Sequence, residues 1–294
     1  MRKALWILAI AILAGLMPAT VMAATTNYDA IYVFGDSYCD VGNDFIGTQG
    51  QVPASPPYYN GRFSNGPIWV EHVAGYLRLP MKPSLAGGTD FAFGGAELLQ
   101  DVTTPEGTVP SVEHQVALYL AATGGVADPN ALYVIQGGGN DILLASGGSP
   151  QQLGTEIGVA IANLETALRI AGAKHFLIPN FFDLGMMPAA KANIGFATAA
   201  SAAANSTLNL LLKLEASQPG IEILRVDIAH LVGAVKTDPT HFGFKTINQP
   251  CLNTTTGAVC KDPDHTFFWD EEHLTEFGHT AIAVAVETVL TDQD

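Results

Sequence analysis

The stretch Ala30-Ile31-Tyr32-Val33-Phe34-Gly35-Asp36-Ser37 decides how the chain folds. Its first five residues offer apolar side chains to both faces of an extended segment. A strand of this kind is typical of a parallel sheet that is buried between helices. Four further runs have the same character and predict strands: Asp90–Phe93, Ala131–Gln136, His175–Pro179 and Glu222–Asp227.

Helix-like stretches alternate with these strands along the whole chain. The predicted helices are Pro67–Leu77, Ser111–Ala121, Pro150–Ala171, Ala190–Ser217 and Glu276–Leu290. Alternation of strands and helices predicts an α/β fold with a doubly wound parallel sheet. No Gly/Ser-rich or Pro-rich linker and no internal repeat interrupts the pattern. We therefore expect one domain over residues 24–294, decorated by two long loops, Gly47–Ser64 and Lys236–Thr266, of a length that is usually functional or mobile.

The first 23 residues have the features of a cleaved signal peptide. Arg2 and Lys3 precede the almost wholly apolar stretch Ala4–Met17, and Val21-Met22-Ala23 provides small residues for a signal peptidase. A membrane anchor is the alternative, but about 14 apolar residues fall short of the roughly 20 that a spanning helix needs. The sequence therefore predicts a secreted or periplasmic protein.

Composition excludes several classes of protein. The chain has 294 residues, of which 48% are hydrophobic, so it is not intrinsically disordered. Its net charge of −15, from 13 basic and 28 acidic residues, leaves no basic patch for nucleic acid. Removal of the signal peptide takes away two positive charges and makes the chain still more acidic.

The cysteines fit an exported protein. Cys251 and Cys260 lie nine positions apart in a polar segment, and an oxidising compartment would let them form a disulfide. Cys39 is then left over, and we expect it to be a small buried apolar side chain. The sequence contains no CxxC or HExxH motif, so we expect no metal site.

Ser37 is the first candidate for chemistry. It follows the first predicted strand and Gly35, which permits a tight turn. In open α/β sheets, ligands bind outside the carboxyl ends of the strands, so Ser37 would project into the binding crevice. Gly-Asp-Ser by itself is an ordinary turn sequence. A serine hydroxyl becomes a nucleophile only when a neighbouring base takes its proton.

The chain offers such a base close to its C-terminus. Asp270 and His273 are three residues apart, directly before the last predicted helix. This spacing lets the carboxylate accept a hydrogen bond from one imidazole nitrogen while the other nitrogen faces outward. Two alternatives are a solvated acidic turn and a metal site formed by Asp270, Glu272 and His273. No further metal ligand can be identified for the second alternative.

Two glycine-rich turns supply candidate donors for a developing negative charge. The segment Gly137–Asp141 reads Gly-Gly-Gly-Asn-Asp and follows a predicted strand. The side-chain amide of Asn140 could point at an oxyanion from this position. Gly94 and Gly95 follow another predicted strand, and their backbone N–H groups are sterically open. With Ser37, Asp270 and His273, these groups would make a nucleophile, a base, its orienting acid and an oxyanion hole.

These motifs together resemble the four ordered blocks of the GDSL, or SGNH, hydrolase family. The blocks are Gly35-Asp36-Ser37, Gly94-Gly95, Gly138-Gly139-Asn140-Asp141 and Asp270-x-x-His273. Phe63-Ser64-Asn65-Gly66 with Trp69, and Asp183-Leu184-Gly185 with Pro188, resemble segments of the secreted lipase-like branch. The resemblance spans residues 30 to about 290. One departure is Tyr38, where the family often has leucine.

The resemblance implies a flavodoxin-like three-layer α/β/α sandwich and ester hydrolysis through an acyl-enzyme. In this comparison Ser37 matches the nucleophile, His273 the base and Asp270 the orienting acid. The oxyanion hole would consist of the Ser37 N–H, a glycine N–H and the Asn140 side chain. Gly94 and Gly95 both match the family glycine, and we choose Gly95. No cofactor and no metal are implied.

We therefore expect a secreted esterase or lipase, with phospholipids among its candidate substrates. Its partner would be a small-molecule or lipid ester, with transient contact with lipid surfaces. Acyl transfer to an alcohol and deacetylation of a polysaccharide would use the same residues. A lipid- or glycan-binding protein on an inactive hydrolase scaffold is the non-enzymatic alternative. The loop with Tyr58, Tyr59 and Phe63 could wall an acyl pocket or merely pack on its own prolines.

Overall fold

Four short parallel strands form the central sheet of the protein. The computed structural model describes residues 28–292, so the predicted signal peptide at residues 1–23 lies outside the described residues. The strands are β1 (Ile31–Phe34), β4 (Leu132–Ile135), β5 (His175–Pro179) and β6 (Glu222–Val226), in the order β1-β4-β5-β6. All four residues of β4 are buried, as its apolar sequence requires.

The predicted strand Asp90–Phe93 is not a regular strand, although it takes the place of one beside β1. The Phe91 N–H donates to the Val33 carbonyl at 2.8 Å, and the two segments run parallel there. On the edge of the segment that faces away from β1, the backbone carbonyls have a side chain as hydrogen-bond donor. The Asn43 side-chain amide donates to the carbonyls of Asp90 and Ala92, both at 2.9 Å. The backbone of residues 82–84 also bonds to Asp90 on this edge, but it forms only an isolated bridge, so no regular ladder develops.

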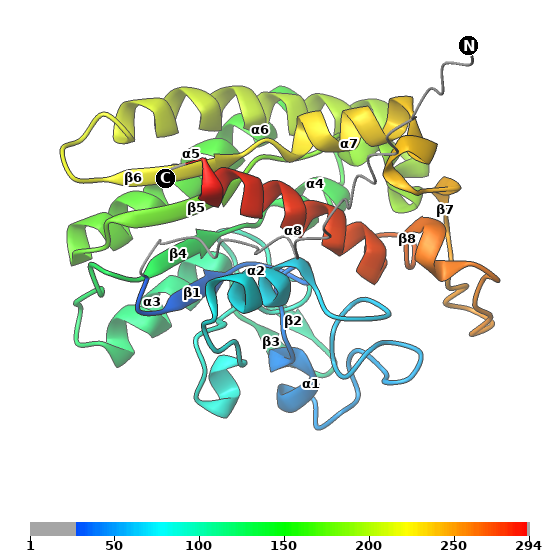
Figure 1. The fold of residues 1–294 in the computed structure, drawn as a ribbon, viewed down its shortest axis with the longest axis horizontal. Coiled ribbons are helices and arrows are strands. Elements are labelled where there is room, and N and C mark those ends of the chain that lie inside the picture. The colour runs from blue at the N-terminus through cyan, green and yellow to red at the C-terminus, as the bar shows by residue number, and fades with distance from the viewer. Residues whose placement is uncertain (1–27, 293–294) are drawn as a thin grey trace, which may run out of the picture.

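Helices flank this sheet and confirm the predicted α/β class. In Figure 1, α2 and α8 pass in front of the strands, and α5 lies behind them. The helices are α1 (Asn43–Gly47), α2 (Trp69–Leu77), α3 (Val112–Ala122), α4 (Gly139–Leu143), α5 (Pro150–Ala171), α6 (Ile194–Glu215), α7 (Ile228–Thr237) and α8 (Glu276–Thr291). None of the helices within residues 28–292 is long and apolar enough to cross a membrane.

One helix prediction needs correction, and the sequence did not predict α1, α4 or α7; α4 begins within the segment Gly137–Asp141 that we expected to be a turn. The helix expected over Ala190–Ser217 begins only at Ile194, because Asn193 has a non-helical backbone conformation. The preceding residues form a short 3-10 helix, Pro188–Ala192. Helix α7 was not expected, although Asp227 caps its first turn by accepting from the His230 N–H at 3.0 Å.

Two small sheets lie outside the central one and were also not expected. Strands β2 (Val102–Thr104) and β3 (Gly107–Val109) form an antiparallel hairpin. Strand β7 (Thr246–Pro250) lies inside the region Lys236–Thr266 that we expected to be loop, and it pairs in parallel with β8 (Thr266–Phe268), which begins at the end of that region. This region contains the predicted disulfide between Cys251 and Cys260. Cys39 is a buried free thiol, as expected.

Helices α5 and α6 approach each other closely because small residues line both of them. A Cβ atom on Gly154 of α5 would collide with the Ala200 carbonyl oxygen of α6. One turn later, a Cβ on Gly158 would lie 2.8 Å from Thr207 Cβ. Residues 197–204 of α6 are all alanine, serine or threonine, so this part of the helix has no large side chain that would hold the helices apart. Close backbone packing is therefore the reason for the small residues on this face.

Gly154→Ala should lower the free energy of unfolding by about 1–3 kcal/mol, because the added methyl group overpacks the α5/α6 contact. Gly233→Ala is the matched control, since a Cβ on this exposed glycine of α7 meets no atom within 4 Å. That substitution should stabilise the protein by roughly 0.5–1 kcal/mol through helix propensity alone. Denaturant unfolding of both variants measures the difference. Equal effects of the two substitutions would contradict close packing at Gly154.

Candidate active site

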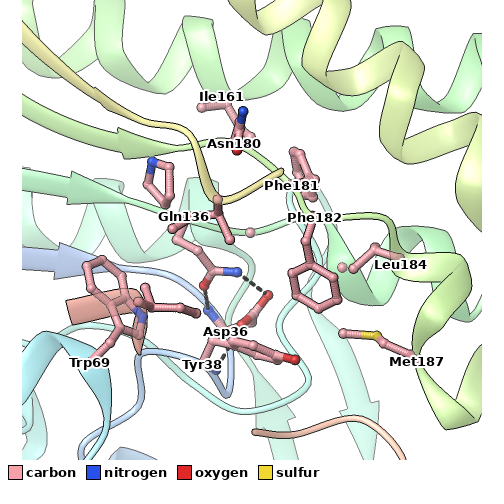
Figure 2. A pocket seen from close by; sticks show the side chains of 15 residues that line it. Asp36, Tyr38, Trp69, Gln136, Ile161, Asn180, Phe181, Phe182, Leu184 and Met187 are labelled. Carbon is pink, nitrogen blue, oxygen red and sulfur yellow. Dashed lines mark hydrogen bonds between the residues drawn. The ribbon is translucent and has the colours of Figure 1, made fainter. Parts of the chain in front are cut away.

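Ser37 lies in a tight turn directly after β1 and is 7% exposed. The turn is held by Asp36, whose carboxylate accepts from the Tyr38 N–H and from the Gln136 side-chain amide, both at 3.0 Å. Figure 2 shows Asp36 and Gln136 pointing at each other on the wall of a small cavity. Burial raises the pKa of Asp36 above its ordinary value. These contacts fix the backbone on either side of Ser37.

The structure brings His273 to Ser37 from the other end of the chain. His273 Nε2 lies 2.9 Å from Ser37 Oγ, a normal hydrogen-bond distance. On the other side of the ring, His273 Nδ1 lies 2.7 Å from Asp270 Oδ2 and 2.9 Å from Oδ1. The three side chains therefore form one continuous hydrogen-bonded chain from hydroxyl to imidazole to carboxylate, as the sequence spacing predicts.

The Asp270 carboxylate is buried and fully surrounded by donors. Its Oδ1 accepts from the backbone N–H groups of Glu272 at 2.8 Å and His273 at 2.7 Å. Its Oδ2 accepts from the Tyr58 hydroxyl at 2.6 Å. Burial alone would raise the pKa of Asp270, but the charge of His273 and these hydrogen bonds lower it below the ordinary value. Asp270 is therefore ionised at neutral pH.

The same partnership acts on His273. Burial lowers the pKa of the imidazole, but the negative charge of Asp270 and its hydrogen bond outweigh burial. The pKa of His273 consequently lies above the ordinary value of 6.5. A raised pKa makes the ring a better proton acceptor than free histidine.

The segment that carries Asp270 and His273 is tied to the first third of the chain. The Tyr38 hydroxyl donates to the Glu272 carbonyl at 2.7 Å. The Ser64 hydroxyl donates to the Leu274 carbonyl at 2.9 Å, and Asn65 Oδ1 accepts from the Glu276 N–H at 2.8 Å. Helix α8 then begins after Thr275, whose hydroxyl accepts from the Gly278 N–H. These ties set the position of His273 relative to Ser37.

Sequence reasoning did not identify the roles of Tyr38, Ser64 and Asn65. The motif Phe63-Ser64-Asn65-Gly66 is the sequence signal for Ser64 and Asn65, but the resemblance alone does not say what these residues bind. The centroids of the Phe63 and His273 rings lie 5.1 Å apart. Together with the hydrogen bonds of Ser64 and Asn65, this contact ties the first three residues of the motif to the C-terminal segment.

The three aromatic residues of the loop Gly47–Ser64, which are Tyr58, Tyr59 and Phe63, make different contacts. Tyr58 is bound to Asp270, so the interpretation of Tyr58 as a wall of an acyl pocket missed its main contact. Tyr59 is exposed at the surface and has the Arg62 guanidinium over its ring. Only Phe63 lies against both the imidazole and an open groove.

Gly94 and Gly95 differ in what their N–H groups can do. Gly94 is buried, and its N–H donates to Asp40 Oδ2 at 3.2 Å. A Cβ on Gly94 would also collide with the Phe63 ring. Gly95 is exposed and has a positive φ of 75°, which glycine adopts without strain. The side-chain amide of Asn140 lies nearby and donates to the Ala96 carbonyl at 2.9 Å.

The loop that carries Gly95 is held from two sides. Asp40 accepts from Gly94, and Asn43 binds the carbonyl of Ala92, so the turn after β1 holds the loop from one side. Asp141 accepts from the Leu98 N–H at 3.2 Å and holds it from the other side. Burial raises the pKa of Asp141 to about 6. Residues that follow β1 and β4, at the starts of α1 and α4, thus position the glycine loop between them.

Within residues 28–292, no group of three or more His, Cys, Asp or Glu side chains is arranged to hold a metal ion. The alternative of a site formed by Asp270, Glu272 and His273 has a specific obstacle. Both Asp270 oxygens already accept hydrogen bonds, and the Glu272 backbone provides one of them.

Known proteins that are similar in sequence to this chain include lipases, esterases and an acyltransferase. The model of the GDSL-like lipase/acylhydrolase family matches residues 31–286. The chain is 28% identical to a phosphatidylcholine-sterol acyltransferase of Aeromonas hydrophila, over 93% of this chain and 83% of that protein. It is also 28% identical to GDSL esterase/lipase 5 of Arabidopsis thaliana, over 85% of this chain and 80% of that protein. A carbohydrate acetylesterase structure from Sinorhizobium meliloti aligns with a TM-score of 0.48 at 14% identity, covering 90% of this chain and 97% of that chain.

Substitutions around Asp270 should move the pKa of His273 in opposite directions. Asp270→Asn removes the negative charge that favours the imidazolium, so the pKa of His273 should fall. Tyr58→Phe removes a donor that shares the Asp270 charge, so the pKa should rise. NMR titration of the His273 ring protons measures both changes.

The control for Tyr58→Phe is Tyr59→Phe, which removes a neighbouring hydroxyl that does not bind Asp270. It should leave the titration of His273 unchanged. A shift as large in Tyr59→Phe as in Tyr58→Phe would contradict a specific effect of the hydrogen bond to Asp270.

Proposed function

The chain belongs to the family of GDSL-like lipases and acylhydrolases and is a carboxylic ester hydrolase; we propose that it acts through an acyl-enzyme on Ser37. The observation that carries this proposal is the hydrogen-bonded chain from Ser37 Oγ through His273 to Asp270. A serine hydroxyl needs an adjacent, oriented base to act as a nucleophile. This geometry supplies both the base and the carboxylate that orients it.

In the first half of the reaction, Ser37 Oγ attacks the ester carbonyl carbon while His273 Nε2 takes the hydroxyl proton. Asp270 accepts from Nδ1, which selects the tautomer with a free lone pair on Nε2 and stabilises the imidazolium that forms. His273 then gives its proton to the leaving alcohol as the tetrahedral intermediate collapses. The products of this half are a free alcohol and an ester between Ser37 and the acyl group.

The tetrahedral oxyanion would be held by the N–H groups of Ser37 and Gly95 and by the Asn140 amide. Gly95 fits this role better than Gly94, because the Gly94 N–H is already bound to Asp40. Asn140 donates one amide hydrogen to Ala96, which orients the side chain and leaves its second hydrogen for the oxyanion. Donors that are fixed before the reaction stabilise the developing charge without reorganisation.

In the second half, water replaces the alcohol. His273 takes a proton from the water, which attacks the acyl-enzyme carbonyl, and returns that proton to Ser37 Oγ as the carboxylic acid leaves. His273 must be neutral to start either half. Activity should therefore fall as the pH drops through the raised pKa of His273.

We further propose that the substrates include lipid esters and that the protein acts outside the cytoplasm. The names of the relatives, which include an esterase/lipase and a phosphatidylcholine-sterol acyltransferase, support lipid substrates. The basic and apolar start of the sequence supports export, as does the disulfide between Cys251 and Cys260.

Ser37→Ala should lower kcat/KM on p-nitrophenyl esters by at least about a thousandfold and abolish labelling by a fluorophosphonate. Asn140→Ala should keep the labelled serine but lower kcat by about 10²–10³, the cost of one oxyanion donor. Thermal unfolding checks that both variants keep the fold.

Ser217→Ala is the control, because Ser217 is an exposed serine beyond the end of α6. It should hydrolyse and label like the unchanged protein. Turnover of Ser37→Ala at the rate of the unchanged protein would overturn Ser37 as the nucleophile. A folded protein that neither hydrolyses esters nor labels would favour a binding protein on an inactive scaffold.

Acyl transfer to an alcohol is the second candidate function, because one relative is named as an acyltransferase. The same acyl-enzyme would form, and an alcohol in place of water would release it as a new ester. Chromatography of the products in the presence of a competing long-chain alcohol or a sterol distinguishes the two. Free acid as the main product under these conditions favours hydrolysis, and a new ester favours transfer.

A further inference from the structure

An open groove of about 500 Å³ lies between the β2–β3 hairpin and α1 with the loop that follows it. We call it the hairpin groove, and its walls include Phe63, Gly94, Gly95, Val102, Val109 and Leu144. Val102 and Val109 are directly opposite each other in the hairpin, so both present their side chains to the same face. Leu144, which follows α4, is 63% exposed on the wall of this groove. The volume lies in the range of small-molecule binding pockets.

One end of the hairpin groove reaches the reacting groups. Gly95, the candidate glycine donor of the oxyanion hole, lines the groove itself. Phe63 lines it as well, and its ring lies 5.1 Å from the His273 ring. A substrate carbonyl bound at Ser37 would therefore have the mouth of this groove directly beside it.

The chemistry of the walls suits a hydrocarbon chain better than an alcohol that carries charge. Among residues 28–292, no lysine, arginine or histidine lines the hairpin groove, so a phosphate-bearing alcohol would find no cation among these side chains. The ionisable side chains on its walls are Asp44 and Glu106. Burial, followed by the nearby charge of Asp40, raises the pKa of Asp44 to about 8, which favours the neutral form of this carboxyl. A neutral carboxyl does not oppose an apolar ligand as a buried charge would.

The cavity in Figure 2 also lies beside the turn that carries Ser37, and it is much smaller. It has a volume of about 70 Å³ and lies behind Asp36 and Tyr38, with Phe181, Phe182 and Met187 among its walls. Its size allows a few water-sized groups, whereas the hairpin groove has room for a chain of many methylenes.

We propose that the hairpin groove binds the acyl chain of the substrate and makes the enzyme prefer medium to long acyl groups. This proposal rests on the proposed function, because it needs the ester carbonyl to be placed at Ser37 and Gly95. The alcohol part of the ester then leaves past His273 toward solvent. Each methylene buried in the groove should raise kcat/KM by about fourfold until the groove is full.

The test compares p-nitrophenyl esters from acetate to decanoate in three variants. Val102→Trp fills the groove, so the ratio of kcat/KM for decanoate to that for acetate should fall at least tenfold, with acetate hydrolysis retained. Thr103→Trp is the matched control. Thr103 is the next residue on β2, is exposed and does not line the groove. Its ratio should stay within about twofold of the unchanged enzyme.

Leu144→Asp is the second test variant, in case a tryptophan in the hairpin disturbs folding. Leu144 is exposed, so a charge there should be tolerated by the fold and still disfavour an apolar chain on the wall. The decanoate-to-acetate ratio should fall again. A parallel series of acetate esters of ethanol to decanol should show no change in its dependence on alcohol length in any variant.

An unchanged decanoate-to-acetate ratio in both Val102→Trp and Leu144→Asp would overturn the acyl assignment, as would loss of the dependence on alcohol length instead. Either result would leave the proposed function intact, because the unchanged enzyme would still hydrolyse esters through Ser37. If the unchanged enzyme hydrolyses no ester of any length, the proposed function fails, and the acyl assignment fails with it.

Discussion

The hydrogen bond between Ser37 and His273 is the contact on which the rest of the site depends, and it joins residues that are 236 positions apart. Neither residue can hold the other in place, because each lies in a short turn. Other hydrogen bonds hold the two turns in position relative to each other. Tyr38, Ser64 and Asn65 each hydrogen-bond to the backbone near His273, and none of them contacts the Ser37 hydroxyl. The accuracy of the site thus comes from backbone anchoring rather than from the reacting side chains.

The same principle holds the candidate oxyanion donors. A loop with two glycines has too much freedom to hold an N–H group in one direction. Here Asp40, in the turn after β1, and Asp141, in the first turn of α4 after β4, each accept from the loop backbone. Since the carboxyl ends of β1 and β4 are neighbours, these two residues can reach the loop from both sides. The parallel sheet therefore contributes to function because it places polar residues that follow neighbouring strands beside the same loop.

The sequence predicted the elements that follow from local pattern and failed where distant contacts decide. The apolar run His175–Pro179 and the capped, amphipathic segment Pro150–Ala171 match the observed β5 and α5 residue for residue. Asp90–Phe93 has the composition of a strand, but the Asn43 side chain and an isolated backbone bridge at Pro83 satisfy its outer edge, and no regular ladder forms. Ser37, Asp270 and His273 could be found because their residue types and spacing carry the chemistry. Tyr58 could not, because its hydrogen bond to Asp270 spans 212 residues and leaves no local signal.

Several acidic residues lie at this site, and their surroundings shift their pKa values in opposite directions. Burial raises the pKa of Asp36, and it raises that of Asp141 to about 6 and that of Asp44 to about 8. Asp270 is also buried, yet its pKa is lowered, because it has an ionisable imidazole and several hydrogen-bond donors as partners. When His273 takes a proton from Ser37, the new positive charge therefore meets one fully ionised carboxylate at hydrogen-bond distance. Glu272 and Asp36 add smaller contributions that also raise the pKa of His273, but Asp270 makes the largest one and is the carboxylate that orients the ring.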